Sequence, residues 1–242
     1  MQDSEISPLH RQFVDYQDAC SHSLAEAFRP PNDRRIGESS LFISDLNQWR
    51  MCTCVGREEV LYAAAVHEYE LAILNMTQSQ YRNAFKSLRL VLELVIQGCY
   101  LSTHLIELNE WLGNARDTNW SLLLDPEKGP FSSRFADAFF PALRERTPIY
   151  SGMARALYRE LSETTHGNVP NLIPLATHLG FDFDTFNLWH EKAESARTIM
   201  TFCLTVRYLQ LLTDAEKLAI EQSVLKHLGH LEPIRASFGG AS

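Results

Sequence analysis

Residues 80–111 read QYRNAFKSLRLVLELVIQGCYLSTHLIELNEW and contain no proline, and their apolar side chains cover most of a helical circumference. A helix with that distribution belongs at the centre of a bundle. Residues 57–76 have the composition and period of a second helix, and the polar break at 77–80 is short, so we expect an antiparallel hairpin. The sequence therefore predicts an all-α fold, an irregular helical bundle with long antiparallel central helices.

The remaining chain is divided by its prolines, which leave stretches 32–125 and 175–232 free for long helices. Ser7 and Pro8 predict the cap and first position of a helix that reaches about residue 28. Further helices are expected at 120–124 (one turn), 132–140, 148–165, 184–212 and 213–229, the last opened by a capping box of Thr213 and Glu216. We expect three parts: residues 1–40 as an N-terminal helix followed by an exposed linker at 29–40, residues 41–230 as a single bundle, and residues 231–242 as a disordered tail.

Composition limits the classes of function. The 242 residues are 45% hydrophobic and carry a net charge of −8, which suits a globular core and excludes a protein that coats nucleic acid with a broad basic surface. A small phosphate site stays open, because residues 134–159 carry five arginines against Asp137 and Glu145. The first ten residues do not resemble a secretory signal, apolar runs are short and the five cysteines are scattered, so we expect a cytoplasmic protein without a membrane partner.

Common cofactor and metal motifs are missing from the sequence. It has no glycine-rich phosphate loop, no His-Glu-x-x-His pair and no Gly-x-Ser-x-Gly elbow. Cys52 and Cys54 lack a second pair of ligands at short spacing. We therefore predict no cofactor and no metal.

The expected helix over residues 148–166 has two distinct faces. On a helical wheel, the core face consists of Ile149, Met153, Leu157 and Leu161. The opposite face carries Arg155, Arg159, Ser162 and His166. Gly167 follows as a helix-ending residue, which places His166 in the last turn.

Two interpretations of this polar face compete. In the first, it is a solvated face with a cationic residue near a helix C-terminus, as in many helices. In the second, it cleaves RNA: His166 moves a proton to or from a ribose 2′-hydroxyl or a leaving oxygen, and Arg159 offsets charge on the phosphate. Arg155, Ser162 and Asn168 would then contact the substrate.

The segment YRELSETTHGN, residues 158–168, resembles the Arg-x4–6-His signature of the HEPN superfamily, with six residues between Arg159 and His166. Glu160 follows the arginine, where active members often have Asn, Asp or His. The resemblance covers one helix, and residues 57–213 by helical architecture. It implies a four- or five-helix bundle, a homodimer, and either a metal-independent endoribonuclease of a prokaryotic defence or toxin system, or a non-catalytic interaction or regulatory module with a protein partner.

A polar stripe runs along the predicted central helix. Its members are Arg82, Lys86, Arg89, Glu93, Gln97, Tyr100, His104 and Glu107. Arg89 and Glu93 are four residues apart in apolar surroundings, so we expect them to pair with each other or with a facing helix. Such a network either fixes the register of the helices or belongs to a groove shared with Arg159 and His166, in which Arg89 and Glu93 help to bind the substrate.

Overall fold

The computed structural model describes residues 7–53, 56–166 and 179–240, and for residues 164–166 it describes the backbone alone. The helices are α1 (Pro8–Ala27), α2 (Asn32–Thr53), α3 (Glu59–Thr77), α4 (Tyr81–Leu101), α5 (Leu105–Leu112), α6 (Trp120–Leu123), α7 (Ser133–Phe139), α8 (Thr147–His166), α9 (Phe183–Tyr208), α10 (Asp214–Leu228) and α11 (Glu232–Ser237), with 3₁₀ turns at Pro141–Arg146 and Leu209–Leu211. None of the described residues is in a strand. The predicted all-α class is confirmed.

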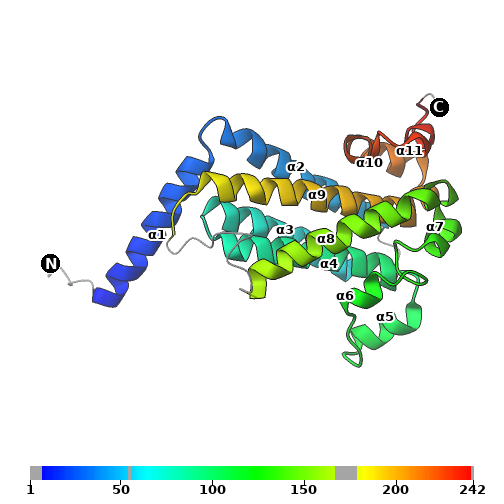
Figure 1. The fold of residues 1–242 in the computed structure, drawn as a ribbon, viewed down its shortest axis with the longest axis horizontal. Helices are drawn as coiled ribbons and strands as arrows, with labels where there is room; N and C mark the ends of the chain where they lie inside the picture. The colour runs from blue at the N-terminus through cyan, green and yellow to red at the C-terminus, as the bar shows by residue number, and fades with distance from the viewer. Residues whose placement is uncertain (1–6, 54–55, 167–178, 241–242) are drawn as a thin grey trace.

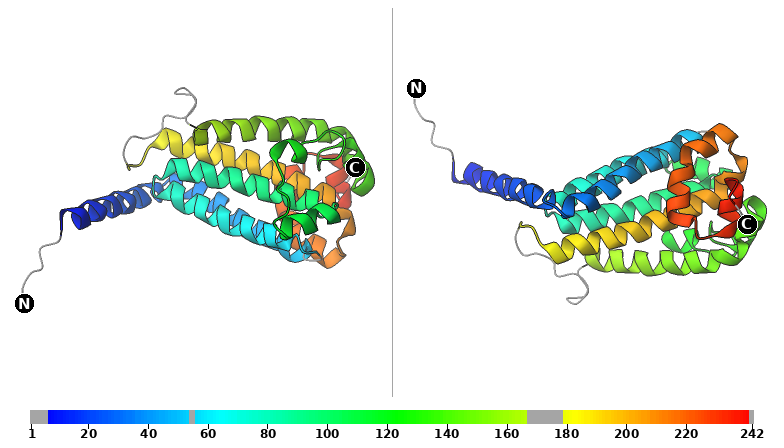
Figure 2. Two further views of the ribbon diagram at one scale, coloured as in Figure 1. Left: turned by 90° about the horizontal axis from the view of Figure 1, so that it is seen from below. Right: turned by 90° about the horizontal axis from the view of Figure 1, so that it is seen from above.

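The bundle is built around α4 and α9, which pack against each other and share α8 as a neighbour (Figure 1). As predicted, α3 and α4 form an antiparallel hairpin, and α2 covers α3 and α9. Figure 2 shows these long helices side by side in both views, with α1 projecting from one end. In the part of the chain that the structure describes, no helix combines the length and apolar character needed to cross a membrane.

Close packing in the centre depends on Gly98 of α4. A Cβ atom at this position would lie 2.6 Å from the Tyr62 ring of α3, nearer than side chains can approach. The Tyr62 hydroxyl is in turn 2.9 Å from the Tyr208 hydroxyl of α9. Glycine thus lets the hairpin close tightly enough for α3 to reach α9.

The expected linker at 29–40 is wrong, because α2 begins at Asn32 and continues without a break to Thr53. Ile36 is 3% exposed and the Ser39 side chain is buried as well. The many charged residues of this stretch therefore lie on the outer side of a helix whose inner side joins the core.

The expected disordered tail is also wrong. Residues 232–237 form α11, and Ile234 is fully buried. Arg235 Nη1 donates to the Gly229 carbonyl at 2.9 Å, and Phe238 packs against the core. One buried isoleucine and one packed ring suffice to order this short segment against α10.

The long central helix is shorter than the sequence predicts, ending at Leu101 rather than near Trp111. The Ser102 hydroxyl donates to the Cys99 carbonyl at 2.7 Å, and the Thr103 hydroxyl donates to the Tyr100 carbonyl at 2.9 Å. These side chains satisfy backbone acceptors at the helix end, so the chain turns and restarts as α5.

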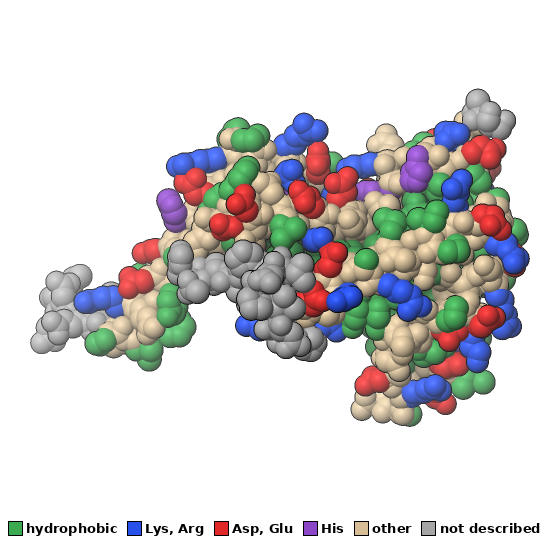
Figure 3. Space-filling view, in the orientation of Figure 1, with side chains coloured by type: hydrophobic (Ala, Val, Ile, Leu, Met, Phe, Trp, Pro, Cys, Tyr) green, Lys and Arg blue, Asp and Glu red, His purple; other side chains and the backbone are tan. Residues whose placement is uncertain are grey.

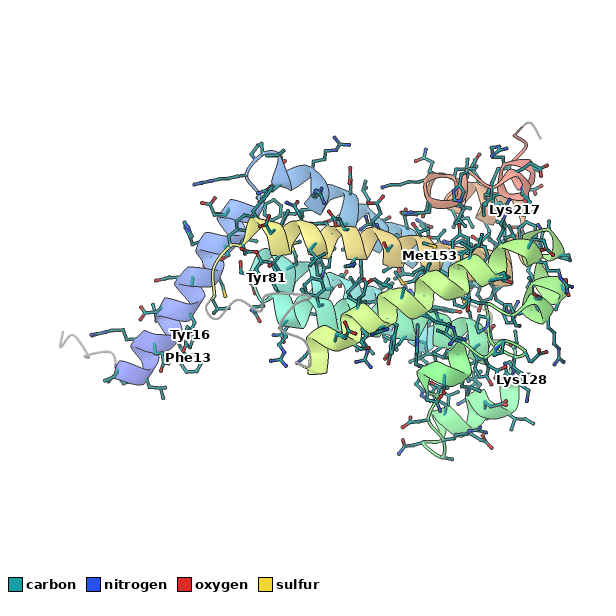
Figure 4. All side chains as sticks on the ribbon, in the orientation of Figure 1. Phe13, Tyr16, Tyr81, Lys128, Met153 and Lys217 are labelled. Carbon is teal, nitrogen blue, oxygen red and sulfur yellow. The ribbon has the colours of Figure 1, made fainter. Side chains whose placement is uncertain are left out.

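Helix α8 has the predicted span but a different buried face. Tyr150, Ala154, Leu157 and Leu161 are buried, while Ile149 is 55% exposed and Met153 is 36% exposed. Met153 is labelled on α8 in Figure 4. The Tyr150 ring stacks on Phe202 of α9 at 3.7 Å between centroids, so the face of α8 that contains Tyr150 is the one packed on α9.

Two predicted helix starts are confirmed in atomic detail. The Ser7 hydroxyl accepts from the His10 backbone amide at 3.1 Å, with Pro8 in the first turn of α1. The Thr213 and Glu216 side chains form the reciprocal capping box that begins α10. Both are local signals, and both are found where the sequence places them.

Candidate functional site

Arg159 lies on the solvent side of α8, with 82% of its side chain exposed. Its Nε donates to Glu163 Oε1 at 3.0 Å, one turn further along the helix. His166 is the last residue of α8, and its side chain lies outside the described residues, as does all of Asn168. The described half of the predicted Arg/His pair is therefore a surface arginine held by one carboxylate.

Glu160, the carboxylate next to Arg159, is directed toward α9. Lys192 Nζ donates to Glu160 Oε2, and the two side chains are 27% and 41% exposed. The Lys192 ammonium, 2.5 Å from Glu160 Oε2, offsets the negative charge of Glu160. The repulsion that Glu160 would exert on a phosphate near Arg159 is correspondingly reduced.

Arg155 and Ser162 both donate hydrogen bonds to backbone carbonyls of this protein. Arg155 Nη2 donates to the carbonyl of Leu124, the residue that follows α6. The Ser162 hydroxyl donates to the Tyr158 carbonyl at 2.6 Å within α8. The contacts of these two predicted substrate-binding residues tie α6 to α8 and complete the backbone bonding of α8.

Arg89 and Glu93 of α4 form the predicted pair, and they also reach the facing helix. Arg89 Nε and Nη2 donate to Glu93 Oε1 at 3.1 and 3.0 Å, and Nη2 donates to the Tyr158 hydroxyl of α8 at 2.7 Å. The Arg89 guanidinium lies 4.6 Å from the Tyr158 ring centroid, and Trp120 of α6 stacks on that ring at 3.9 Å. Three helices thus meet at Tyr158.

This cluster sets the chemistry of Tyr158. Burial raises the pKa of its hydroxyl, and the neighbouring Glu93 carboxylate raises that pKa further, against the opposing effect of Arg89. The phenol stays protonated at neutral pH and donates or accepts hydrogen bonds as a neutral group. These contacts agree with the first interpretation of the stripe, a polar network that fixes the register of α4 against α8.

The far end of the predicted stripe lies in a different place. Tyr100, His104 and Glu107 line a cavity of about 450 Å³ near the corner between α4 and α5, together with Lys128 and Arg134. Figure 4 marks Lys128 on this side of the molecule, away from α1. The turn after Leu101 therefore separates this end of the stripe from the Arg89 cluster.

The arginines of residues 134–159 do not form one basic surface. Arg144 pairs with Asp137, Arg155 binds the end of α6, and Arg134 lines the cavity by α5. Only Arg159 combines high exposure with a position on the last turns of α8. All five arginines of this stretch, including Arg146, are exposed, but they are spread over α7, the 3₁₀ turn before α8 and α8 itself.

Sequence reasoning missed two polar residues of α9, His190 and Arg197, each 4% exposed. They are seven residues apart, which puts them on one face of α9. That spacing of two polar residues among apolar ones is the sequence pattern that could have identified them. Burial is the main cause that lowers the pKa of His190, to about 3, and Arg197 lowers it further. Across the described ranges, no three His, Cys, Asp or Glu side chains are grouped to hold a metal ion.

The candidate catalytic pair therefore consists of the exposed Arg159 on α8 and of His166, two turns later at the end of the same helix. An exposed guanidinium can bind a phosphate oxygen, and a histidine in the last turn of a helix is suited to proton transfer. No protein-family model, curated protein or solved structure matches this chain.

Proposed function

We propose that this protein is a HEPN-like, metal-independent endoribonuclease of the kind used in prokaryotic defence or toxin systems, with Arg159 and His166 as its catalytic residues. The observation that carries the proposal is the exposure of Arg159, 82% of its side chain, beside a Glu160 that Lys192 neutralises. Among the described residues the Arg159 guanidinium bonds Glu163 through Nε, so its Nη1 and Nη2 groups are available to a phosphate.

The proposed chemistry gives each of the two residues a separate role. The ribose 2′-oxygen attacks phosphorus and the bond from phosphorus to the 5′-oxygen breaks, which leaves a 2′,3′-cyclic phosphate. One histidine removes the 2′-hydroxyl proton and another protonates the 5′-oxygen, while Arg159 offsets charge on the phosphoryl oxygens. In a homodimer the second copy supplies the second His166, and two faces of α8 form one cleft.

The test is RNA cleavage by the purified protein in the presence of EDTA. We expect fragments ending in a 2′,3′-cyclic phosphate, and we expect the His166→Ala variant to lose this activity by about a hundredfold or more. Arg29→Ala is the matched control, because Arg29 is an exposed arginine paired with Glu26 at 2.8 Å, away from α8. Cleavage that persists in His166→Ala, or that is absent from the wild-type protein, contradicts the proposal.

A second candidate is a non-catalytic interaction or regulatory module, and α1 is the observation that favours it. Leu9, Phe13 and Tyr16 lie on one side of this projecting helix and are 65%, 62% and 46% exposed. Figure 4 shows Phe13 and Tyr16 together on the helix beyond the bundle. Exposed apolar helix faces of this kind are typical of protein contacts.

Light scattering after gel filtration distinguishes this candidate. If α1 is the functional surface, Phe13→Ser changes the association state of the protein with itself or with a regulatory protein, while Val14→Ser on an adjacent face does not. In that case neither the wild-type protein nor His166→Ala cleaves RNA, and the two have the same association state.

A further inference from the structure

A separate cavity of about 510 Å³ lies where the first turns of α2 and α9 meet. Asn32 at the start of α2 and Phe183 at the start of α9 both line it. In Figure 1 the two helices start at the end of the bundle to which α1 is attached. The volume is within the range of small-molecule sites, and the cavity is distinct from the α8 surface.

The inner wall of the cavity contains two buried side chains, His190 and Arg197, each 4% exposed. The Ser39 hydroxyl connects them: it lies 3.0 Å from His190 Nδ1 and accepts from Arg197 Nη1 at 3.1 Å. Arg197 Nη1 also donates to the Tyr69 hydroxyl at 3.1 Å. These contacts fix the two side chains in the wall.

The Ser39 hydroxyl accepts from Arg197 Nη1 and retains its own hydrogen to donate. In the tautomer in which that hydrogen is donated to His190 Nδ1, the hydrogen of the neutral imidazole lies on Nε2. Within the described residues, neither His190 Nε2 nor Arg197 Nε has a hydrogen-bond partner, and both atoms are buried. The wall thus contains two buried polar nitrogens that lack a partner among the described residues.

The buried charge in this wall belongs to Arg197, whose effect on the half-buried Asp45 opposes the rise that burial causes in the pKa of that carboxyl. Arg197 forms no ion pair with any carboxylate in the part of the chain that the structure describes, and neither does Arg35, half-buried in the wall. A buried cation and two such nitrogens are stabilised by an anionic acceptor.

We infer that this cavity binds the carboxylate or phosphate group of a small molecule, with Arg197 Nε and His190 Nε2 donating to its oxygens. The site goes beyond the RNA cleavage proposed above and holds whether or not RNA is cleaved. Planar recognition of an oxyanion by a guanidinium and a neighbouring donor is the chemistry these two side chains share.

The outer wall limits the ligand further. Glu191 and Glu194 of α9 are exposed, and neither has an ion-pair partner among the described residues, whereas Glu38 is bound by Arg34 at 3.1 Å. Figure 3 shows acidic and basic side chains close together over the first turns of α2 and α9. Two free carboxylates at the rim repel a polyanion and attract an amine, so the ligand is a small zwitterion.

Calorimetric titration of the full chain tests this site with four probes. Phosphoethanolamine and 4-aminobutyrate carry an anion and an amine, and ethyl phosphate and butyrate are their counterparts without the amine. We expect binding of phosphoethanolamine or 4-aminobutyrate, and which of the two binds identifies phosphate or carboxylate as the anion. The counterpart without the amine, ethyl phosphate or butyrate, should bind more weakly than the zwitterion. Equal affinity for the two would overturn the role of Glu191 and Glu194.

Three variants locate the binding. Arg197→Gln should weaken the affinity by about tenfold or more, since it leaves the ligand anion unpaired. Asn187→Tyr fills the cavity from its wall without touching the buried cluster and should abolish binding, which keeps the test decisive if Arg197→Gln fails to fold. Arg144→Gln removes the same charge at a distant site and should bind as the wild type does. The inference is overturned if the wild type binds none of the probes, or if Asn187→Tyr binds them unchanged.

Discussion

His190 and His227 are buried histidines whose pKa values respond to the surrounding core. Burial is the main cause that lowers their pKa, to about 3 for His190 and about 4 for His227, and Arg197 lowers both further. In the unfolded chain each titrates near the ordinary value of 6.5. Both rings are therefore neutral in the folded protein over a range in which the unfolded chain takes up protons.

The sign of the pH effect follows from that difference. Above about pH 6.5 both states are neutral and the two histidines contribute no pH dependence, whereas below it the unfolded state binds more protons and the free energy of unfolding falls. We expect His227→Gln to reduce the loss of stability between pH 7 and pH 5 by about 2 kcal/mol. Urea unfolding at the two pH values measures this difference, and an unchanged loss in the variant would show that His227 is protonated in the folded protein.

At the scale of elements, α11 is an integral part of the bundle. Ile234 is fully buried at the end of the chain, so Ile234→Ala should lower the free energy of unfolding by about 2–4 kcal/mol. Leu218→Ala on α10 is the control, because Leu218 is 71% exposed and its truncation should change stability by less than about 0.5 kcal/mol. Equal urea midpoints for wild type and Ile234→Ala would mean that residues 232–237 do not pack as described.

The elements that the sequence predicts well are those with local signals. Ser7 and Thr213 mark helix starts because their hydroxyls bond backbone amides three residues away. The start of α2 was missed because charged residues surround Ile36, whose burial depends on packing against distant helices. The same holds for α11, where the final turn is ordered by tertiary contacts that no local pattern records.

In the candidate site, too, the sequence predicts contacts within one helix but not contacts between helices. The pair of Arg89 and Glu93 was predictable because both residues are on one helix, four positions apart. Their contact with Tyr158 was not, since it depends on how α8 docks on α4. The role of Arg155 likewise depends on Leu124, 31 residues away, which no helical wheel can show.

At the scale of the whole molecule, α8 is the element that joins structure to the proposed activity. One side packs on α4 and α9, and the other side faces solvent. Arg155 and Arg159 are one turn apart and both exposed, yet the first binds the Leu124 carbonyl after α6 and the second binds Glu163 of its own helix. The fold therefore assigns different roles to two arginines that the sequence presents as equivalent.

The most direct test of the central claim compares Arg159→Ala with Arg155→Ala in one preparation series, measuring RNA cleavage in EDTA and melting temperature. Arg159→Ala should lose cleavage by about a hundredfold or more without a change in melting temperature, because its side chain is exposed. Arg155→Ala should melt at a lower temperature, because it loses its bond to Leu124, and should still cleave RNA below that temperature. Undiminished cleavage by folded Arg159→Ala, or no cleavage by the wild-type protein, would contradict the assignment of Arg159 to the reaction.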